Sequence, residues 1–169
     1  RAIGELGLGF LYAPRHHGAM RYAVGPRQAL GIRTLFNLLG PLSNPASAPN
    51  QVLGVFDTRW LEPLARVLAN LGSRHVLVVH ADDGMDELST LGPTRMAELY
   101  EGDVLHHDLD PEQLGFRRPE RRDLEAGDAE HNAAILSGIL NGESGPQRDI
   151  AVLNAAAALY VAGVAHSLE

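Results

Sequence analysis

The sequence predicts an α/β fold with a central, mostly parallel sheet flanked by helices. Short apolar segments alternate with helical segments along the chain, which is the order expected of a parallel sheet with crossover helices. Residues 75–80 form an almost continuous apolar run, typical of a strand that is buried on both faces. A strand, a helix and a second strand follow one another within residues 51–80, which indicates a parallel crossover unit.

The first part of the chain contains short predicted elements separated by glycine and proline. Gly9 and Pro14 bound an apolar segment that we interpret as a strand. Thr34 is placed to cap a helix, and Gly40 with Pro41 is expected to end it. The elements are a strand at residues 10–13, helices at 16–23, 26–31 and 35–39, and a loop at 43–50.

Longer elements are predicted in the rest of the chain. Leucines recur at helical spacing from Leu61 to Leu71, and Gly72 is the expected C-cap. Asp128 is expected to cap a further helix, and Pro146 to open the last one. The nearly all-apolar body of that last helix predicts that it is buried. The strands are expected at residues 51–56 and 75–80, and a hairpin at 94–109 with its turn at 101–103.

Composition excludes several classes of protein. The chain has 169 residues, of which 45% are hydrophobic, so we expect residues 1–169 to form a single α/β domain. It has no cysteine, which excludes disulfides and thiolate metal sites and fits a cytoplasmic protein. The net charge of -7 disfavours a nucleic-acid partner, and no apolar run is long enough to cross a membrane. The start lacks Met and has the pattern of a helix interior, so we expect an excised piece of a longer protein.

Three sequence stretches carry a resemblance to a known family. They are His16-His17-Gly18-Ala19-Met20 with Arg27 and residues 30–34, then residues 36–45, then residues 78–80 with Gly84-Met85-Asp86-Glu87-Leu88-Ser89. In this order and spacing they are similar to anthranilate phosphoribosyltransferases across nearly the whole chain, and residues 128–157 also resemble that family. The sequence departs from the family pattern at Gly18 and at residues 24–26.

The resemblance implies the carboxyl-terminal part of the large domain of a nucleoside-phosphorylase or phosphoribosyltransferase-like enzyme. Such an enzyme joins anthranilate to phosphoribosyl pyrophosphate with Mg²⁺, giving phosphoribosyl-anthranilate and pyrophosphate for tryptophan biosynthesis. The resemblance also implies a small helical domain that forms a homodimer interface in the full-length enzyme. The family's glycine-rich phosphate loop does not occur in these residues, so we expect the chain alone to be inactive.

Asp86 and Glu87 are the candidate metal ligands. They follow the predicted buried strand at residues 75–80, and open α/β sheets place ligand sites beyond the carboxyl ends of their strands. Mg²⁺ is held by one or two carboxylates together with substrate oxygens. The resemblance assigns this acidic pair to the metal site. The alternative is a solvated loop, in which Asp82 and Asp83 are equally good acids.

Arg27 is the candidate anthranilate-binding residue. A guanidinium pairs with a carboxylate through two parallel hydrogen bonds, and the free N–H groups of a helix start favour anions. The resemblance places the anthranilate-binding arginine here, whereas we interpret Arg33 as structural; the alternative for Arg27 is a surface arginine. The resemblance also implies that four further residues line the anthranilate tunnel: His17, Ala13, Met20 and Pro41. No general base and no other catalytic residue is assigned.

Other polar residues are predicted to be structural. His106 and His107 are adjacent on a strand and point to opposite faces, so they do not share a metal. His80 ends a buried strand, and Asn154 lies in an apolar helix where its amide needs a buried partner. Two alternative functions stay open: a pyrimidine-nucleoside phosphorylase of the same fold, and a non-catalytic binding protein related to it.

Overall fold

A computed structural model describes residues 2–11, 22, 25–26, 29, 31, 36–44 and 46–168. By its internal contacts the chain divides into two units, residues 1–47 and 48–169. All but residue 22 of the predicted helix at residues 16–23, half of that at 26–31, and the second half of the predicted strand at 10–13 lie outside the described residues. That the whole chain forms a single domain stays a prediction.

The first unit contains two described helices, α1 (Ala2–Leu6) and α4 (Phe36–Leu42). The α1 helix agrees with the helical pattern at the start of the sequence. Phe10 and Leu11 are not in a strand, and Phe10 is 91% exposed. The predicted helix at 35–39 is confirmed as α4, but it continues through Gly40 and Pro41 to Leu42. Proline is tolerated there because the helix ends one residue later, so the missing N–H affects only the last turn.

The second unit is built on a sheet of four strands in the order β1-β2-β3-β4. The strands are β1 (Asn50–Gly54), β2 (His75–Ala81), β3 (Thr94–Tyr100) and β4 (Asp103–Leu109). β1 and β2 are parallel, as predicted, whereas β2–β3 and β3–β4 are antiparallel. The described sheet is therefore mixed rather than mostly parallel. A parallel pair needs a crossover, and only the β1–β2 connection contains a helix long enough to make one.

The β3–β4 hairpin is confirmed at its predicted position. Its two-residue turn places Glu101 at φ 51° and Gly102 at φ 96°. Positive φ at both central residues characterises the type I′ turn, whose twist matches that of the strands it joins. β4 is paired on one side only in the described sheet, and most of its residues are exposed.

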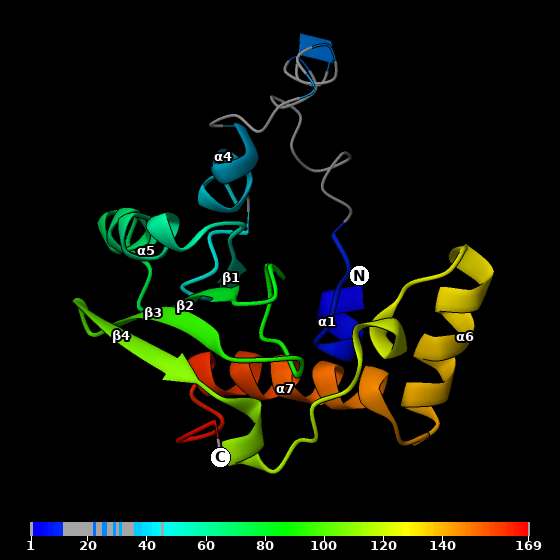
Figure 1. Cartoon of the computed structure of the whole chain (residues 1–169). Helices are drawn as coiled ribbons and strands as arrows, with labels where there is room; N and C mark the ends of the chain where they lie inside the picture. Colours follow the sequence, from blue (N-terminus) through cyan, green and yellow to red (C-terminus); the bar gives the residue numbers. More distant parts are fainter. Residues whose placement is uncertain are drawn as a thin grey trace. The chain divides into compact units, whose positions relative to one another are not determined.

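Helices cover both faces of the sheet (Figure 1). α5 (Leu61–Asn70) contacts β2 and β3 on one face, and α7 (Pro146–Val161) lies across the other. α6 (Ala129–Leu140) packs beside α7 and begins after Asp128, whose side chain accepts a hydrogen bond from the His131 N–H. The shorter 3-10 helices are η2 (Thr58–Trp60), η3 (Pro111–Leu114) and η4 (Arg121–Leu124).

The core between the sheet and α7 follows the alternation of β-strand side chains. Leu77 and Val79 of β2 point to the α7 side and pack with Leu153, Ala157 and Val161 of that helix. The intervening β2 residues point to the opposite face, where α5 lies. The side chains of residues 76–79, which alternate between the two faces, are all fully buried. This confirms that β2 is buried on both faces along these residues.

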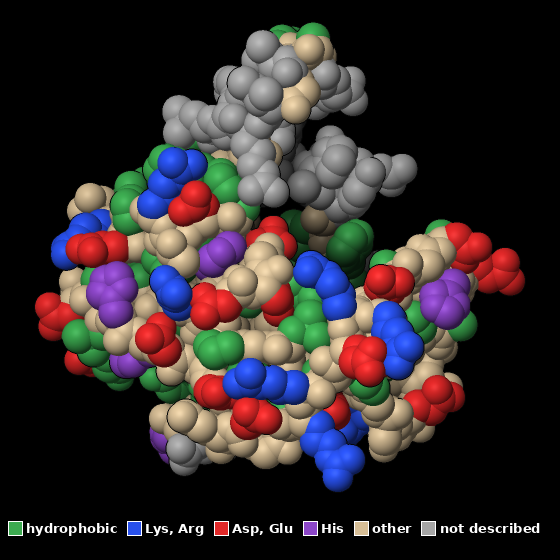
Figure 2. Space-filling model, viewed as in Figure 1, with side chains coloured by type: hydrophobic (Ala, Val, Ile, Leu, Met, Phe, Trp, Pro, Cys, Tyr) green, Lys and Arg blue, Asp and Glu red, His purple; other side chains and the backbone are tan. Residues whose placement is uncertain are grey.

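The prediction that the last helix is buried is only partly correct. Leu153, Ala157 and Val161 are buried, but Val152 is 40% exposed and Leu159 is 50% exposed. An apolar composition does not show which side of a helix faces solvent, and small alanines occupy much of the outer side of α7. In the part of the chain that the structure describes, no helix is long and apolar enough to cross a membrane. Acidic and basic side chains are interspersed on the face seen in Figure 2.

Candidate functional site

The candidate site is the loop that joins β2 to β3, residues 82–93, which we call the acidic loop. It contains Asp82, Asp83, Asp86 and Glu87. The loop leaves the sheet at the carboxyl end of β2, beside the carboxyl end of its parallel neighbour β1. This is the edge where α/β sheets bind ligands. The acids follow β2 at its carboxyl end, as the sequence indicated, and their assignment to a metal site stays a prediction.

Hydrogen bonds within the loop fix its first turn. The Gly84 N–H donates to the Ala81 carbonyl at 2.9 Å, and the Ala81 N–H donates to the Met85 carbonyl at 3.0 Å. Gly84 has φ 94°, a left-handed conformation that glycine adopts without steric cost. The loop therefore turns sharply at Gly84 before it reaches the acidic pair.

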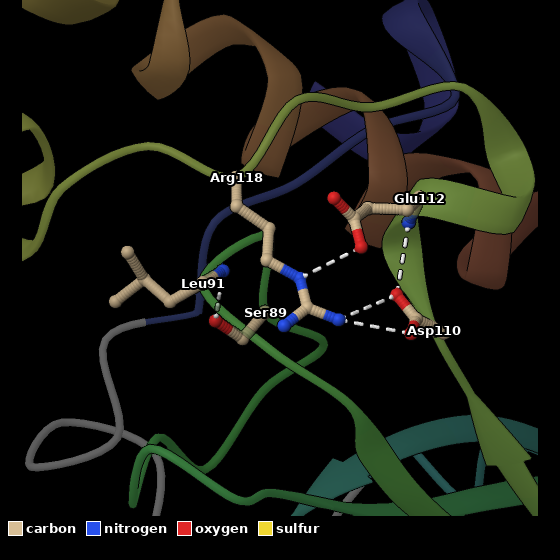
Figure 3. A network of polar contacts seen from close by, with 5 residues as sticks. All are labelled: Ser89, Leu91, Asp110, Glu112 and Arg118. Atoms are coloured by element: carbon tan, nitrogen blue, oxygen red, sulfur yellow. Dashed lines mark hydrogen bonds and ion pairs between the residues drawn. The ribbon is translucent and has the colours of Figure 1, made fainter.

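Two of the four acidic side chains have structural partners. The Asp83 carboxylate accepts hydrogen bonds from the Met85 N–H, at 2.9 Å, and from the Ser89 hydroxyl. Ser89 Oγ also accepts from the Leu91 N–H at 3.0 Å (Figure 3). Asp82 forms an ion pair with Arg95, with 3.2 Å between Oδ1 and Nε. Because their carboxylates already have partners, Asp82 and Asp83 are less suited to bind a metal than Asp86 and Glu87 are.

Asp86 and Glu87 are exposed and make no side-chain hydrogen bond or ion pair with any other described residue. Although Glu87 lies at the surface, partial burial of its carboxyl group raises its pKa above the usual 4.5, and the nearby Asp86 and Asp83 carboxylates raise it further. A bound cation would offset this repulsion. The charge and the oxygen donors of the pair thus fit Mg²⁺.

The described residues hold no cluster of three or more His, Cys, Asp or Glu side chains placed to bind a metal ion. Mg²⁺ does not require one, because it is commonly held by one or two carboxylates with the remaining positions filled by water and substrate phosphates. The pair fits a metal that is shared with a phosphorylated substrate, and does not fit a closed structural metal site.

Gly54, the last residue of β1, sets the position of the acidic pair from one side. A Cβ atom added to Gly54 would overlap the backbone carbonyl of Asp86. The Asp86 backbone therefore lies directly against the end of β1, at a separation that only glycine allows. No feature of the local sequence pattern indicated this contact, because the two residues lie in different elements.

Asn154 of α7 sets the position of the loop from the other side. Its Oδ1 accepts a hydrogen bond from the Leu88 N–H at 3.0 Å, and its Nδ2 donates to the Leu88 carbonyl at 2.8 Å. The Leu88 side chain is fully buried in the core beneath α7. The predicted need of Asn154 for a buried partner is confirmed, and the partner is the backbone next to Glu87.

Of the other predicted site residues, Pro41 lies half-buried in α4, within the first unit. Four lie outside the described residues, and their assignments stay predictions: Arg27, His17, Ala13 and Met20. His80 is structural, as predicted, because its Nδ1 lies 2.7 Å from the Val55 carbonyl oxygen. His106 pairs with Glu62 and His107 with Glu98, on opposite faces of the sheet, which confirms that they do not share a metal.

A buried carboxylate that the sequence interpretation missed lies on the α7 side of the sheet. Glu98 Oε1 is 2.7 Å from His75 Nε2 and accepts from the Tyr160 hydroxyl at 2.8 Å, while Oε2 is 2.8 Å from His107 Nε2. Burial, followed by the bond to Glu98, raises the pKa of Tyr160 to about 12. A glutamate within the apolar strand segment 96–99 was the available signal.

A second charged group supports the segment that follows β4. Arg118 donates from its Nη2 to both carboxylate oxygens of Asp110, at 3.1 and 2.9 Å, and its Nε lies 3.2 Å from Glu112 (Figure 3). The backbone N–H of Glu112, followed by Arg118, lowers the pKa of Asp110. This group holds the turn at η3 and is exposed, so we interpret it as structural.

The raised pKa of Glu87 predicts the effect of replacing it. The raised pKa means that the fold favours the neutral carboxyl of Glu87. The stabilisation from this carboxyl is therefore fully present below pH 4.5, and it is lost as the pH rises through the raised pKa. Near pH 7 the charged carboxylate therefore opposes folding. Without metal ions, Glu87→Gln is expected to raise the thermal midpoint at pH 7 and to leave it nearly unchanged at pH 4.

Thermal unfolding with a chelator present measures this difference. Glu101→Gln, in the exposed hairpin turn, is the control and is expected to have no such pH-dependent effect. A lower midpoint for Glu87→Gln at pH 7 would show that the carboxylate stabilises the fold, contrary to the expectation.

The chain is similar to known proteins in both sequence and fold. The sequence profile described as "Glycosyl transferase family, a/b domain" matches residues 1–169. The chain belongs to this glycosyl transferase family. The α/β fold expected from the sequence is confirmed by the same match and by the structural neighbours of this glycosyl transferase domain.

Curated relatives of the glycosyl transferase domain carry the name anthranilate phosphoribosyltransferase. Those from Thioalkalivibrio sulfidiphilus and Methylococcus capsulatus are 60% and 55% identical over 167 residues, which is 99% of this chain and 49% of each relative. The chain spans about half the length of the curated relatives it matches. The resemblance seen in the sequence is thereby confirmed.

Solved structures show the same similarity. The anthranilate phosphoribosyltransferase from Thermus thermophilus is 47% identical with a TM-score of 0.90, covering 99% of this chain and 49% of that one. The Saccharomyces cerevisiae enzyme in complex with PRPP and Mg is 30% identical with a TM-score of 0.80, covering 92% of this chain and 45% of that one.

Proposed function

We propose that the complete protein carrying this chain transfers the phosphoribosyl group of phosphoribosyl pyrophosphate to anthranilate, in tryptophan biosynthesis. The observation that carries the proposal is the acidic pair Asp86–Glu87, without described side-chain partners at the carboxyl edge of β1 and β2. It occurs in a chain 60% identical to a relative named for this activity. We further propose a cytoplasmic homodimer for the complete protein.

The reaction forms a bond between the anthranilate nitrogen and C1 of the ribose, and breaks the bond from C1 to the pyrophosphate oxygen. Mg²⁺ would neutralise charge on the departing pyrophosphate. Asp86 and Glu87 would hold it, together with substrate oxygens. The anthranilate nitrogen is nucleophilic when unprotonated, so the protein's contribution is positioning and stabilisation of the leaving group, and no general base is assigned.

Arg27 would bind the anthranilate carboxylate through a two-pronged charge-assisted hydrogen bond. His17, Ala13, Met20 and Pro41 would line the same acceptor site. Solved relatives from Saccharomyces cerevisiae support both substrates, since one is in complex with 4-fluoroanthranilate and another with PRPP and Mg. A nucleoside phosphorylase has no acceptor carboxylate to bind. A role for Arg27 in binding a carboxylate would therefore distinguish phosphoribosyl transfer to anthranilate from nucleoside phosphorolysis.

Replacing Arg27 by alanine tests the acceptor site. Loss of a charge-assisted hydrogen bond costs about 1.5–3 kcal/mol, so anthranilate is expected to bind at least about tenfold more weakly to the Arg27→Ala protein. The measurement is titration of the complete protein with anthranilate, in the presence of Mg²⁺, followed by anthranilate fluorescence.

Arg33→Ala is the matched control, since Arg33 is a nearby arginine without a role in the proposed site. It is expected to bind anthranilate as the unmodified protein does. Equal affinity in the two variants would reject the assignment of Arg27. Phosphate-dependent cleavage of a pyrimidine nucleoside, with no anthranilate binding, would favour a phosphorylase instead.

A further inference from the structure

We propose that Asn154 is a positioning residue for the acidic pair, and that α7 thereby fixes the cation site from 66 residues away in sequence. The inference rests on the proposed function of Asp86 and Glu87. Asn154 contacts neither carboxylate in the structure; it acts through the backbone of Leu88, the residue that follows Glu87.

The contact has the form of a backbone pair. The carboxamide accepts from the Leu88 N–H at 3.0 Å and donates to the Leu88 carbonyl at 2.8 Å. Only asparagine and glutamine carry both a carbonyl acceptor and an N–H donor in one planar side chain. The same Nδ2 donates to the Ile150 carbonyl of α7 at 3.0 Å, which holds the amide plane at a fixed angle to the helix.

The helix that carries Asn154 is itself anchored. Its neighbour Leu153 is fully buried and packs in the same core cluster as Leu88. Leu88 is therefore held by its side chain in the core and by its backbone on Asn154. A residue so held cannot shift without disturbing both contacts.

The acidic pair lies between two fixed points of the backbone. On one side the Asp86 carbonyl lies against Gly54, where a Cβ atom would overlap it. On the other side Leu88 is bonded to Asn154. Glu87 is the single residue between them, so the direction in which its carboxylate leaves the loop is set from β1 and α7 together.

A structural role alone predicts a different result from a positioning role. An amide that merely satisfies buried backbone groups contributes to stability and leaves the affinity for a cation unchanged. A positioning role predicts that cation affinity falls more than stability loss explains, because second-shell partners orient metal ligands and their removal weakens binding by about 10–100-fold.

The test uses Mn²⁺ alone as the probe, titrated into the complete protein, with free Mn²⁺ followed by its electron paramagnetic resonance signal. Asn154→Leu removes the pair of bonds to Leu88, and Asn154→Ser removes them without adding apolar volume. Gln147→Leu is the matched control, because Gln147 lies on the same helix and donates to the Asp123 carbonyl at 2.7 Å. Thermal midpoints are measured for every variant.

Both Asn154 variants are expected to weaken Mn²⁺ binding about tenfold, whereas Gln147→Leu is expected to lower the thermal midpoint and to leave Mn²⁺ binding unchanged. Equal Mn²⁺ affinity in the Asn154 and Gln147 variants overturns the positioning role. Mn²⁺ titration of the Glu87→Gln variant distinguishes a failure of the positioning role from a failure of the proposed metal site. If this variant too leaves Mn²⁺ binding unchanged, the metal site itself is rejected.

Discussion

Replacement of Glu98 by alanine is expected to lower the free energy of unfolding by about 3–5 kcal/mol, the range measured when one partner of a buried charged group is removed. Glu98 has only 9% of its side chain exposed, and it is the common partner of His75, His107 and Tyr160. Alanine would leave the buried His75 ring and the partly buried Tyr160 hydroxyl without their acceptor. Leaving a buried polar group without a hydrogen-bond partner destabilises the fold.

Urea unfolding measures this loss, and Glu62→Ala is its control. Glu62 also pairs with a histidine of β4, His106, and with Arg66, but it lies at the surface. Surface ion pairs contribute little, because solvent screens them. A loss for Glu98→Ala no greater than that for Glu62→Ala would mean that burial of the Glu98 group does not determine its contribution.

Replacement of Gly54 by alanine is expected to destabilise the fold by about 3 kcal/mol, the upper end of the range for overpacked sites. The added Cβ atom would overlap the Asp86 carbonyl, which is a backbone atom. A side chain could rotate away, but here either β1 or the acidic loop must move. The acidic loop is held at Leu88, so the strain is not relieved locally.

Gly92→Ala is the matched control for Gly54→Ala. Gly92 lies in the same loop, has no atom within 4 Å of its would-be Cβ, and is not among the glycines with positive φ. Denaturant unfolding of the two variants is expected to show a large loss for Gly54→Ala and a small change for Gly92→Ala. Similar losses would indicate that the close approach at Asp86 relaxes without cost.

Local patterns predicted the elements of the fold more successfully than their arrangement. The apolar run of β2, the leucine spacing of α5 and the Glu101-Gly102 turn of the hairpin each depend on residues close in sequence. The direction of β3 relative to β2 depends on whether the connection between them forms a crossover. In the acidic loop the Asp82 N–H donates to the Pro93 carbonyl, so the loop closes on itself and forms no crossover. The composition of the loop did not indicate this closure.

The position and chemistry of the acidic residues indicated the candidate site in the sequence. The contacts that hold the acidic loop in place could not be predicted in the same way. Asp82, Asp83, Asp86 and Glu87 are equivalent as acids in the sequence, and only the partners of the first two distinguish them. Those partners include the distant Arg95. Likewise the bonds of Asn154 to Leu88 join residues 66 positions apart in sequence. The sequence could therefore indicate that a partner exists but not which residue it is.

β4 has one edge without a partner strand in the described sheet, and such an edge can pair wrongly with other chains. An unpaired strand edge is a template for strands of other chains, and native proteins discourage such pairing with charged residues and short edges. β4 begins with Asp103 and carries Asp108 as its last residue but one, with His106 and His107 between them, and these side chains are exposed. This edge of the described sheet thus carries exposed charged and imidazole groups beside the exposed Leu105. A chain approaching to extend β4 would have to desolvate these groups before gaining any backbone hydrogen bond.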